Sequence, residues 1–264
     1  MKNNIKFSII SPNYNKAEYI EEFMNSILNQ TYKNYELIFI DDASTDNSVE
    51  VASKFDIEIL HTNHLQAGGA RNLGLSKATG DYIIFLDSDD YLARPTVLEE
   101  LANMITDEDI IFLNYTKNNF GEISLIEEKY PTLDGAIEFT TNLGVPTKCF
   151  KREIIKDLKF PESKRFEDMI FTLEAMCKSK KELHFKEPFF VYRKVANSNS
   201  SATIELDTMI DIFEELIKMY RLCDKYPEHK IHLLNRIKRD KLSTRLNIMD
   251  ELIETGNNTF KEHF

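Results

Sequence analysis

The 264-residue sequence contains little cysteine, no long hydrophobic run and no excess of positive charge. Its three cysteines, Cys149, Cys177 and Cys223, are far apart, so they fit neither a disulfide framework nor a Cys-x-x-Cys metal site and indicate a reducing compartment. No apolar run approaches the ~18 residues of a membrane helix. The formal net charge of −11 argues against a nucleic-acid-binding chain. The N-terminus lacks the small-residue cleavage site of a signal peptide, so we expect a cytoplasmic protein.

The common phosphate-binding glycine loops, GxGxxG and GxxxxGK[ST], are also absent. An acidic protein that binds an anionic ligand therefore needs local cations, helix N-termini or a metal. The stretch "QAGGARN" offers two such features, because Gly68 and Gly69 allow close backbone approach and Arg71 supplies a cation.

The first 115 residues alternate between strand and helix patterns. Runs such as "FSII" and "YIIFL" are apolar without alternation, which predicts strands covered on both faces and a largely parallel α/β sheet. For the helix over 16–30 we expect Asn15 as N-cap, with Glu18 completing a capping box. The predicted strands are 6–11, 35–41, 57–60 and 81–87, and the predicted helices are 16–30, 47–55, 69–78 and 95–105.

The second half is more mixed. Strands are expected over 109–116 and 122–128, a helix over 165–179, an extended segment over 182–194 and a polar loop over 195–204. From about Leu206 to Ile253 the pattern is helical, interrupted near Pro227.

Acidic or polar clusters follow three of the predicted strands: "SPNYN", "DDASTD" and "DSDD". Open α/β sheets bind ligands outside the carboxyl ends of their strands, so all three should line one edge. Asp87 and Asp89 can hold a hard divalent cation, with phosphate oxygens and water completing its shell. The alternative is a solvated turn in which Asp89 or Asp90 caps a helix. Asp42 can accept hydrogen bonds from a nucleobase or ribose, whereas Asp46 is the more natural helix cap.

The segments "SIISPNYN", "ILNQTYKNYELIFIDDASTD", "GGARNLGL" and "GDYIIFLDSDDYL" resemble, in order and spacing, family 2 glycosyltransferases of the GT-A fold. The resemblance spans about residues 6–115. Two looser matches follow, "RFEDMIF" and "VYRKVANSNS". The resemblance implies a GT-A catalytic domain over 1–204 and a C-terminal helical extension over 205–264. Within the domain, 1–115 would be the nucleotide-sugar-binding half and 116–204 the acceptor-side half.

The resemblance also implies roles for individual residues. Asp42 would accept from the base of a donor, expected to be UDP-linked. Asp89 would coordinate Mn²⁺ or Mg²⁺, and Asp87 would contact the ribose or join the metal site, directly or through a metal-bound water. Asp168 would be the catalytic base; by pattern alone, a helix-start charge explains "FED" about equally well. Asp90 is left open between metal shell and helix cap. The full set implied for the nucleotide sugar is Pro12, Asn13, Tyr14, Asp42, Arg71, Asp87, Asp89, Arg193 and Ser198.

The expected activity is one displacement with inversion, from a nucleotide-diphosphate sugar to a hydroxyl of a glycan or lipid-linked acceptor, in bacterial surface polysaccharide or lipooligosaccharide synthesis. A processive synthase is disfavoured, since such relatives carry membrane spans and a Gln-x-x-Arg-Trp motif and this sequence has no tryptophan. The alternatives are a sugar-phosphate nucleotidyltransferase and a non-catalytic sugar-nucleotide-binding domain.

The stretch from Lys225 to Arg245 is rich in Lys and Arg with apolar residues between them. A helix packed on the catalytic domain with a solvated basic face is the favoured interpretation. Peripheral contact with the inner face of the cell membrane, or a homodimer contact, are the alternatives.

Overall fold

The computed structural model describes residues 4–126, 143–161, 167–195 and 217–239. The chain divides into two compact units, one of residues 1–129 with 142–202 and the other of residues 130–141 with 203–264. The boundary that the sequence predicts between a catalytic domain over 1–204 and an extension over 205–264 stays a prediction.

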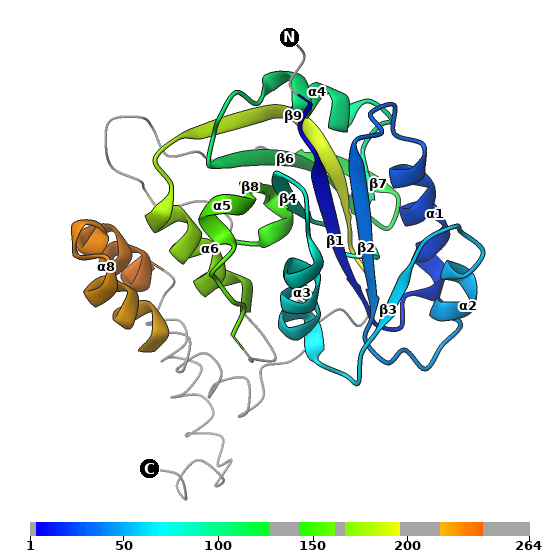
Figure 1. Cartoon of the computed structure of the whole chain (residues 1–264), viewed down its shortest axis with the longest axis horizontal. Helices are drawn as coiled ribbons and strands as arrows, with labels where there is room; N and C mark the ends of the chain where they lie inside the picture. The colour runs from blue at the N-terminus through cyan, green and yellow to red at the C-terminus, as the bar shows by residue number, and fades with distance from the viewer. Residues whose placement is uncertain (1–3, 127–142, 162–166, 196–216, 240–264) are drawn as a thin grey trace, which may run out of the picture. The chain divides into compact units, whose positions relative to one another are not determined.

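The first unit is built on a nine-stranded sheet (Figure 1). Its strand order is β3-β2-β1-β4-β8-β6-β9-β5, and β7 pairs with β6. The strands are β1 (Phe7–Asn13), β2 (Tyr35–Asp41), β3 (Ile59–His61), β4 (Tyr82–Phe85), β5 (Tyr91–Leu92), β6 (Ile110–Asn119), β7 (Glu122–Ile126), β8 (Lys148–Lys151) and β9 (Glu182–Arg193).

The sheet has a parallel part and a mixed part. β3, β2, β1 and β4 are parallel, as predicted. β8 then runs antiparallel to both β4 and β6, β9 is parallel to β6, and β5 is antiparallel to β9. The expected α/β sheet flanked by helices is therefore confirmed, with its parallel strands confined largely to the first half of the chain.

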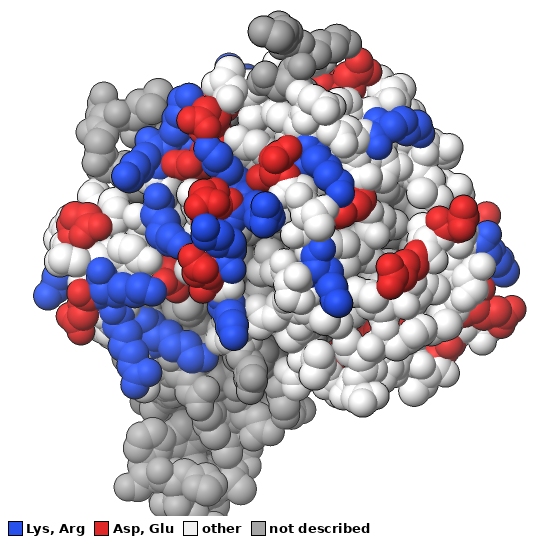
Figure 2. All heavy atoms as spheres, viewed as in Figure 1, with Lys and Arg blue, Asp and Glu red and all other residues white. Residues whose placement is uncertain are grey.

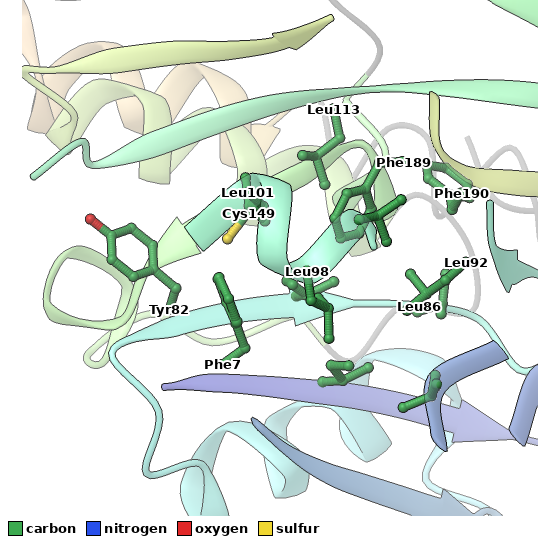
Figure 3. Close-up of a cluster of buried hydrophobic side chains, with 14 of the residues drawn as sticks. Phe7, Tyr82, Leu86, Leu92, Leu98, Leu101, Leu113, Cys149, Phe189 and Phe190 are labelled. Carbon is green, nitrogen blue, oxygen red and sulfur yellow. The ribbon is translucent and has the colours of Figure 1, made fainter. Parts of the chain in front are cut away.

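Helices cover both faces of the parallel strands, as the unalternating apolar runs predict. On one face, α1 and α4 bury apolar side chains with Phe7 and Ile9 in a single cluster (Figure 3). On the other face α3 lies so close that a Cβ added to Gly74 would come 2.4 Å from Ile10. The helices are α1 (Ala17–Leu28), α2 (Ser48–Ala52), α3 (Gln66–Lys77), α4 (Val97–Met104), α5 (Arg152–Ile155) and α6 (Glu167–Lys178).

The start of α1 is capped differently from the prediction. Lys16 occupies the N-cap position without a side-chain cap bond, so Asn15 as N-cap is wrong. Instead, the Ala17 N–H donates to Asp46 Oδ2 at 3.0 Å, and the other oxygen of Asp46 accepts from the Ser48 N–H at 2.9 Å. One carboxylate thus serves the first turns of both α1 and α2, which ties the two strand-end loops together.

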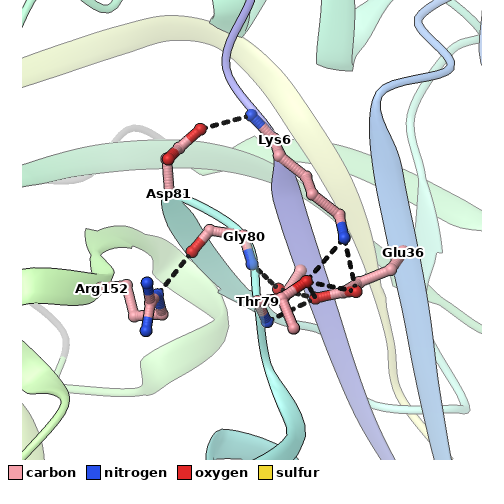
Figure 4. A network of polar contacts seen from close by, with 7 residues as sticks. Lys6, Glu36, Thr79, Gly80, Asp81 and Arg152 are labelled. Atoms are coloured by element: carbon pink, nitrogen blue, oxygen red, sulfur yellow. Dashed lines mark hydrogen bonds and ion pairs between the residues drawn. The ribbon is translucent and has the colours of Figure 1, made fainter.

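At the opposite edge of the sheet, a polar network joins the starts of β1, β2 and β4 (Figure 4). Glu36 accepts from Lys6 Nζ at 2.8 Å, from the Ser8 hydroxyl at 2.5 Å and from the Thr79 N–H at 2.7 Å. These bonds lower the pKa of Glu36 to about 2, although its burial acts in the other direction.

The surface of the first unit mixes charges of both signs. Figure 2 shows Lys and Arg side chains interspersed with Asp and Glu over the region of α5 and α6. Two ion pairs of this unit join Lys156 with Glu153 at 2.8 Å and Lys151 with Asp107.

In the second unit, residues 217–225 are helical, followed by η2 (Pro227–His229) and α8 (Lys230–Arg239). The expected C-terminal helices are present, and Lys241 and Arg245 of the basic stretch lie outside the described residues. Within the part of the chain that the structure describes, no helix is long and apolar enough to cross a membrane.

Candidate active site

The carboxyl ends of β1, β2 and β4 meet around the buried side chain of Asn13. Its amide nitrogen donates to Asp41 Oδ1 at 2.9 Å and to Ser44 Oγ at 3.1 Å. Its side-chain oxygen accepts from the Ser88 hydroxyl at 2.9 Å. The side-chain amide of Asn13 thus joins the three strand ends that the sequence predicts to lie at one edge. Asn13 is 1 % exposed. The side chain of Asn13 lies inside this scaffold.

Asp42 anchors the start of α3. Its Oδ1 accepts from the Thr62 hydroxyl at 2.5 Å and the Leu65 N–H at 2.6 Å, and its Oδ2 accepts from the Gln66 N–H at 2.7 Å. The helix-capping role considered for its neighbours therefore applies to Asp42 as well.

An aromatic pair lies at this end of the site. The rings of Tyr14 and His64 have centroids 4.9 Å apart with planes inclined at 59°. Tyr14 is 43 % exposed, and His64 is also exposed, in a turn where its φ is 59°. Exposed ring faces next to the loops of Pro12 and Asp42 can stack against a planar ligand such as a nucleobase.

Each acidic residue of "DSDD" has a partner from a different element. Asp87 Oδ1 lies 2.8 Å from Arg71 Nη2 on α3. Asp89 Oδ2 lies 2.6 Å from Lys16 Nζ, just before α1. Asp90 Oδ1 accepts the backbone N–H of Arg193 at the end of β9, at 2.8 Å. The acidic loop is therefore held from three directions.

The three carboxylates differ in access to solvent. The side chains of Asp87 and Asp89 are 35 % and 17 % exposed, whereas Asp90 is 1 % exposed. Burial, and then the charge of Asp87, raise the pKa of Asp89, which Lys16 opposes. Burial and the charges of Asp89 and Asp87 raise the pKa of Asp90 well above its ordinary value. Asp90 is thus a buried anchor, Asp89 is mostly buried, and Asp87 is the most accessible of the three.

The carboxylate oxygens of Asp87 and Asp89 fit a divalent cation that binds together with a phosphate ligand. Within residues 4–126, 143–161, 167–195 and 217–239, no group of three or more His, Cys, Asp or Glu side chains is arranged to hold a metal. Mg²⁺ at nucleotide sites uses one or two carboxylates and takes its other oxygens from phosphates and water. Asp87 and Asp89 match that requirement, and the raised pKa of Asp89 indicates that additional positive charge would be favourable there.

Arg71 connects this loop to α6. Its guanidinium is 5 % exposed, donates from Nη1 to Glu167 Oε1 at 2.6 Å and from Nη2 to Asp87, and lies 5.6 Å from the centre of the Phe160 ring. Glu167 directly precedes Asp168 in the first turn of α6. The structure therefore brings the start of α6, predicted about eighty residues away in sequence, to the acidic strand ends.

Asp168 has an environment suited to proton transfer. Burial, followed by the charges of Glu167 and Asp87, raises its pKa to about 6, and Arg71 and Lys148 act against that rise. The ammonium of Lys148 is fully buried, 2.8 Å from Thr147 Oγ1 and 3.2 Å from the Gly144 carbonyl oxygen. A carboxylate with this pKa is ionised at neutral pH and can accept a proton.

Arg193 reaches the acidic loop through its backbone N–H, which donates to Asp90, while its guanidinium contacts other side chains. Its guanidinium lies 4.9 Å from the ring centres of both Tyr19 and Tyr91 and donates to Glu22 at 2.7 Å. Ser198 lies outside the described residues.

Sequence reasoning did not assign three charged residues of the site, Lys16, Lys148 and Glu167. Lys16 follows the strand-end turn "SPNYN", and a cation at that point was a usable signal in an acidic protein. Lys148 begins the strand "KCFK", where a lysine suggests solvent exposure. The sequence pattern of Glu167 and Asp168 is also typical of charges at a helix start. Only the fold reveals the bond between Glu167 and Arg71.

Comparison with known proteins identifies relatives across most of this chain. The family model described as "Glycosyl transferase family 2" matches residues 8–196. An uncharacterized glycosyltransferase of Haemophilus influenzae is 34 % identical over 207 residues, which cover 73 % of this chain and 82 % of that protein. Glycosyltransferase GlyG of Streptococcus pneumoniae is 30 % identical, covering 82 % of this chain and 80 % of that protein.

A longer relative also has a solved structure. Poly(ribitol-phosphate) beta-N-acetylglucosaminyltransferase TarS of Staphylococcus aureus is 28 % identical over 250 residues, which cover 87 % of this chain but only 43 % of TarS. The structure of TarS 1-349 in complex with UDP-GlcNAc matches with a TM-score of 0.67 at 26 % identity, covering 82 % of this chain and 67 % of that one. Mannosyltransferase PcManGT of Pyrobaculum calidifontis, in complex with GDP-Man and Mn²⁺, shares the fold with a TM-score of 0.62 at 17 % identity, covering 96 % of this chain and 76 % of that one.

Proposed function

The chain belongs to glycosyl transferase family 2, and on that basis we propose that it is an inverting glycosyltransferase. It transfers a sugar from a UDP-linked donor to a hydroxyl group of a glycan or lipid-linked saccharide. The observation that carries the proposal is the bridge made by Arg71, which holds Asp87 and Glu167 together and so brings the donor-side carboxylates and Asp168 to one site.

The donor side of the proposal uses the strand-end loops. The ring faces of Tyr14 and His64 and the carboxylate of Asp42 receive the base, with Pro12 and Asn13 forming the adjoining backbone. The exposed aromatic pair supports a nucleotide donor, and the UDP-GlcNAc bound by TarS, a 26 % identical neighbour, supports uridine as its base. Asp87 and Asp89 would hold Mn²⁺ or Mg²⁺. The cation, once bound, would stabilise the negative charge that develops on the departing diphosphate.

The acceptor side depends on Asp168. As the bond between the anomeric carbon and the diphosphate oxygen breaks, the acceptor oxygen forms a new bond on the opposite face of the sugar. The hydroxyl proton passes to the Asp168 carboxylate, and the electron pair leaves with UDP. Because the pKa of Asp168 is about 6, transfer should decline as the pH falls below 6 and the base becomes protonated.

The test is UDP release with a panel of donors and acceptors, with and without Mn²⁺. UDP-GlcNAc and UDP-glucose come first, because the relatives are named for N-acetylglucosaminyl and glucosyl transfer to poly(ribitol-phosphate). Asp89→Ala should abolish the metal-dependent turnover. Asp168→Asn should bind UDP like the wild type and lose transfer. Asp157→Asn is the matched control, because it makes the same change of charge at an exposed residue.

The main alternative is a sugar-nucleotide-binding domain without activity. It predicts UDP-sugar binding but no turnover with any donor and acceptor. Normal transfer by Asp168→Asn would instead leave the enzyme assignment intact and remove Asp168 as its base. The biological setting in which we place the reaction, bacterial surface polysaccharide or lipooligosaccharide synthesis, is tested by extending the same assay to purified cell-surface acceptors.

A further inference from the structure

The backbone of Lys16 is fixed at the edge of the site. Its N–H donates to Ser48 Oγ at 3.0 Å, and the next N–H, that of Ala17, donates to Asp46 Oδ2 at 3.0 Å. The preceding Asn15 has a φ of 52°, and its side-chain oxygen accepts the Thr45 N–H at 2.7 Å. The base of the Lys16 side chain is therefore held in place, while its four-carbon stem keeps its own torsional freedom.

The ion pair between Lys16 and Asp89 is close but not sealed from water. Nζ lies 2.6 Å from Oδ2, and the two side chains are 24 % and 17 % exposed. Because Asp89 is mostly buried, the loss of the ammonium would leave its charge uncompensated unless another cation took its place. The contact can therefore be exchanged for a second cation, such as a divalent metal, rather than simply broken.

Arg71, the other cation that pairs with the acidic loop, cannot leave its partners in the same way. Arg71 is 5 % exposed and engaged by Asp87 and Glu167 at once, so releasing it would leave two carboxylates without their partner. Asp90 is held by a backbone N–H, which cannot leave independently of β9. If Lys16 moves away, only Asp89 loses its partner, and Asp89 is partly exposed. Lys16 is therefore the partner that can be exchanged most easily.

We propose that Lys16 is an exchangeable counter-ion of Asp89, which neutralises this carboxylate before the donor binds, releases it to the divalent cation and then pairs with the donor's diphosphate. This inference rests on the proposed function, since it takes Asp89 as a metal ligand. An ammonium and a divalent cation repel one another, so they compete for the same carboxylate oxygen. The diphosphate that accompanies the metal gives the released ammonium a new anionic partner.

The test measures two affinities that should change in opposite directions in Lys16→Met. The first is the affinity of nucleotide-free protein for Mn²⁺ alone, from the EPR signal of free Mn²⁺. It should rise about fivefold, because the competing ammonium is gone. The second is the affinity for UDP at saturating Mn²⁺, from calorimetry. It should fall about tenfold, because a charged hydrogen bond to the diphosphate is lost.

Lys33→Met is the matched control. It removes the same charge from an exposed lysine whose ammonium contacts the Leu28 carbonyl at 3.0 Å, and it should change neither affinity. A loss of both affinities in Lys16→Met would indicate a merely structural residue and overturn the inference. An unchanged Mn²⁺ or UDP affinity would overturn it equally.

Asp89→Asn separates this inference from its premise. If Asp89→Asn leaves Mn²⁺ affinity unchanged, the metal assignment in the proposed function fails. If Asp89→Asn abolishes Mn²⁺ binding while Lys16→Met does not strengthen it, the metal assignment stands and the counter-ion role of Lys16 is wrong.

Discussion

Four cations lie near five carboxylates at this site, and their individual contacts decide which groups can move. Asp87, Asp89, Asp90, Glu167 and Asp168 supply the negative charge, and Lys16, Arg71, Lys148 and Arg193 lie among them. Arg71 and Lys148 are buried, so they act as fixed charges. Such pre-oriented charges stabilise a developing charge without reorganising during the reaction.

Arg71→Lys tests whether this arginine positions other groups or binds the nucleotide. An ammonium cannot bond Asp87 and Glu167 with the geometry of a planar guanidinium. Because the start of α6 would then shift relative to the acidic loop, we expect kcat to fall about 100-fold. The Kd for UDP, measured by calorimetry, should change less than about threefold.

A direct nucleotide contact, which the family resemblance implies for Arg71, predicts the reverse pattern. The Kd for UDP would then rise about tenfold or more in Arg71→Lys. Arg152→Lys provides the control, because Arg152 Nε donates to the Gly80 carbonyl oxygen at the opposite edge of the sheet.

The ionised carboxylate of Asp168 should lower the free energy of unfolding at neutral pH. Its folded-state pKa of about 6 lies above the ordinary value of 3.8, so folding favours the protonated carboxyl. The resulting cost is absent below pH 3.8, grows as the pH rises to 6 and is fully present above it. Asp168→Asn removes the ionised form and should therefore raise the free energy of unfolding by about 1–3 kcal/mol at pH 7.5.

Urea denaturation at pH 7.5 and pH 4 checks both the size and the sign. The gain should shrink towards zero at pH 4, and Asp157→Asn should show no gain at either pH. Equal stability of Asp168→Asn and the wild type at pH 7.5 would mean that Arg71 and Lys148 fully compensate the buried charge.

At the scale of elements, the network around Glu36 fastens β1, β2 and the turn before β4. The Glu36 carboxylate accepts from three residues on these segments, and its pKa is lowered to about 2. A lowered pKa means that the ionised form stabilises the fold. This contribution is fully present above the ordinary pKa of 4.5 and is lost as the pH falls towards 2.

Glu36→Gln should therefore lower the free energy of unfolding by about 1–3 kcal/mol at pH 7. The difference from the wild type should narrow as the pH approaches 2, which a pH series of urea denaturation curves measures. Glu58→Gln is the control, as an exposed residue next to β3. A Glu36 variant as stable as this control at pH 7 would contradict the role of the network.

The elements also show where sequence reasoning succeeds and where it fails. The parallel strands were predictable because burial on both faces requires unbroken apolar runs, and "YIIF" of β4 is entirely buried. β8 was not predicted, because its first residue is a lysine. Lys148 is nevertheless fully buried, and Thr147 and Gly144 satisfy its ammonium. β5 is too short, at two residues, to have a pattern.

The wrong N-cap prediction for Asn15 and the unexpected cap by Asp42 have a common physical cause. Asp46 caps α1 from a residue 29 positions further along the chain, and Asp42 accepts from residues up to 24 positions away. Capping rules describe bonds within one turn of sequence, so they cannot anticipate caps made by a neighbouring loop. The clustering of acidic residues was predictable, since parallel strands place their carboxyl ends together. Which partner each carboxylate takes depends on the fold.

On the scale of the whole molecule, the candidate active site combines elements from distant parts of the first unit. The acidic loop follows β4, its partners come from α3, the start of α1 and the end of β9, and the candidate base begins α6. A ligand that engages this edge should therefore stabilise the unit as a whole.

UDP and Mn²⁺ should stabilise the protein jointly and only weakly alone. The described carboxylates form no group of three that could hold Mn²⁺ by themselves, and UDP without metal adds negative charge beside Asp87 and Asp89. With each ligand at ~100 times the Kd that it has in the presence of the other, we expect a joint gain of at least about 2.7 kcal/mol, and at the same concentrations less than about 1 kcal/mol for either alone, measured by thermal unfolding. Asp89→Asn should abolish the joint gain and Glu58→Gln should retain it. An equal gain from UDP in EDTA would indicate metal-independent donor binding, and a full gain from Mn²⁺ alone would indicate a preformed metal cage.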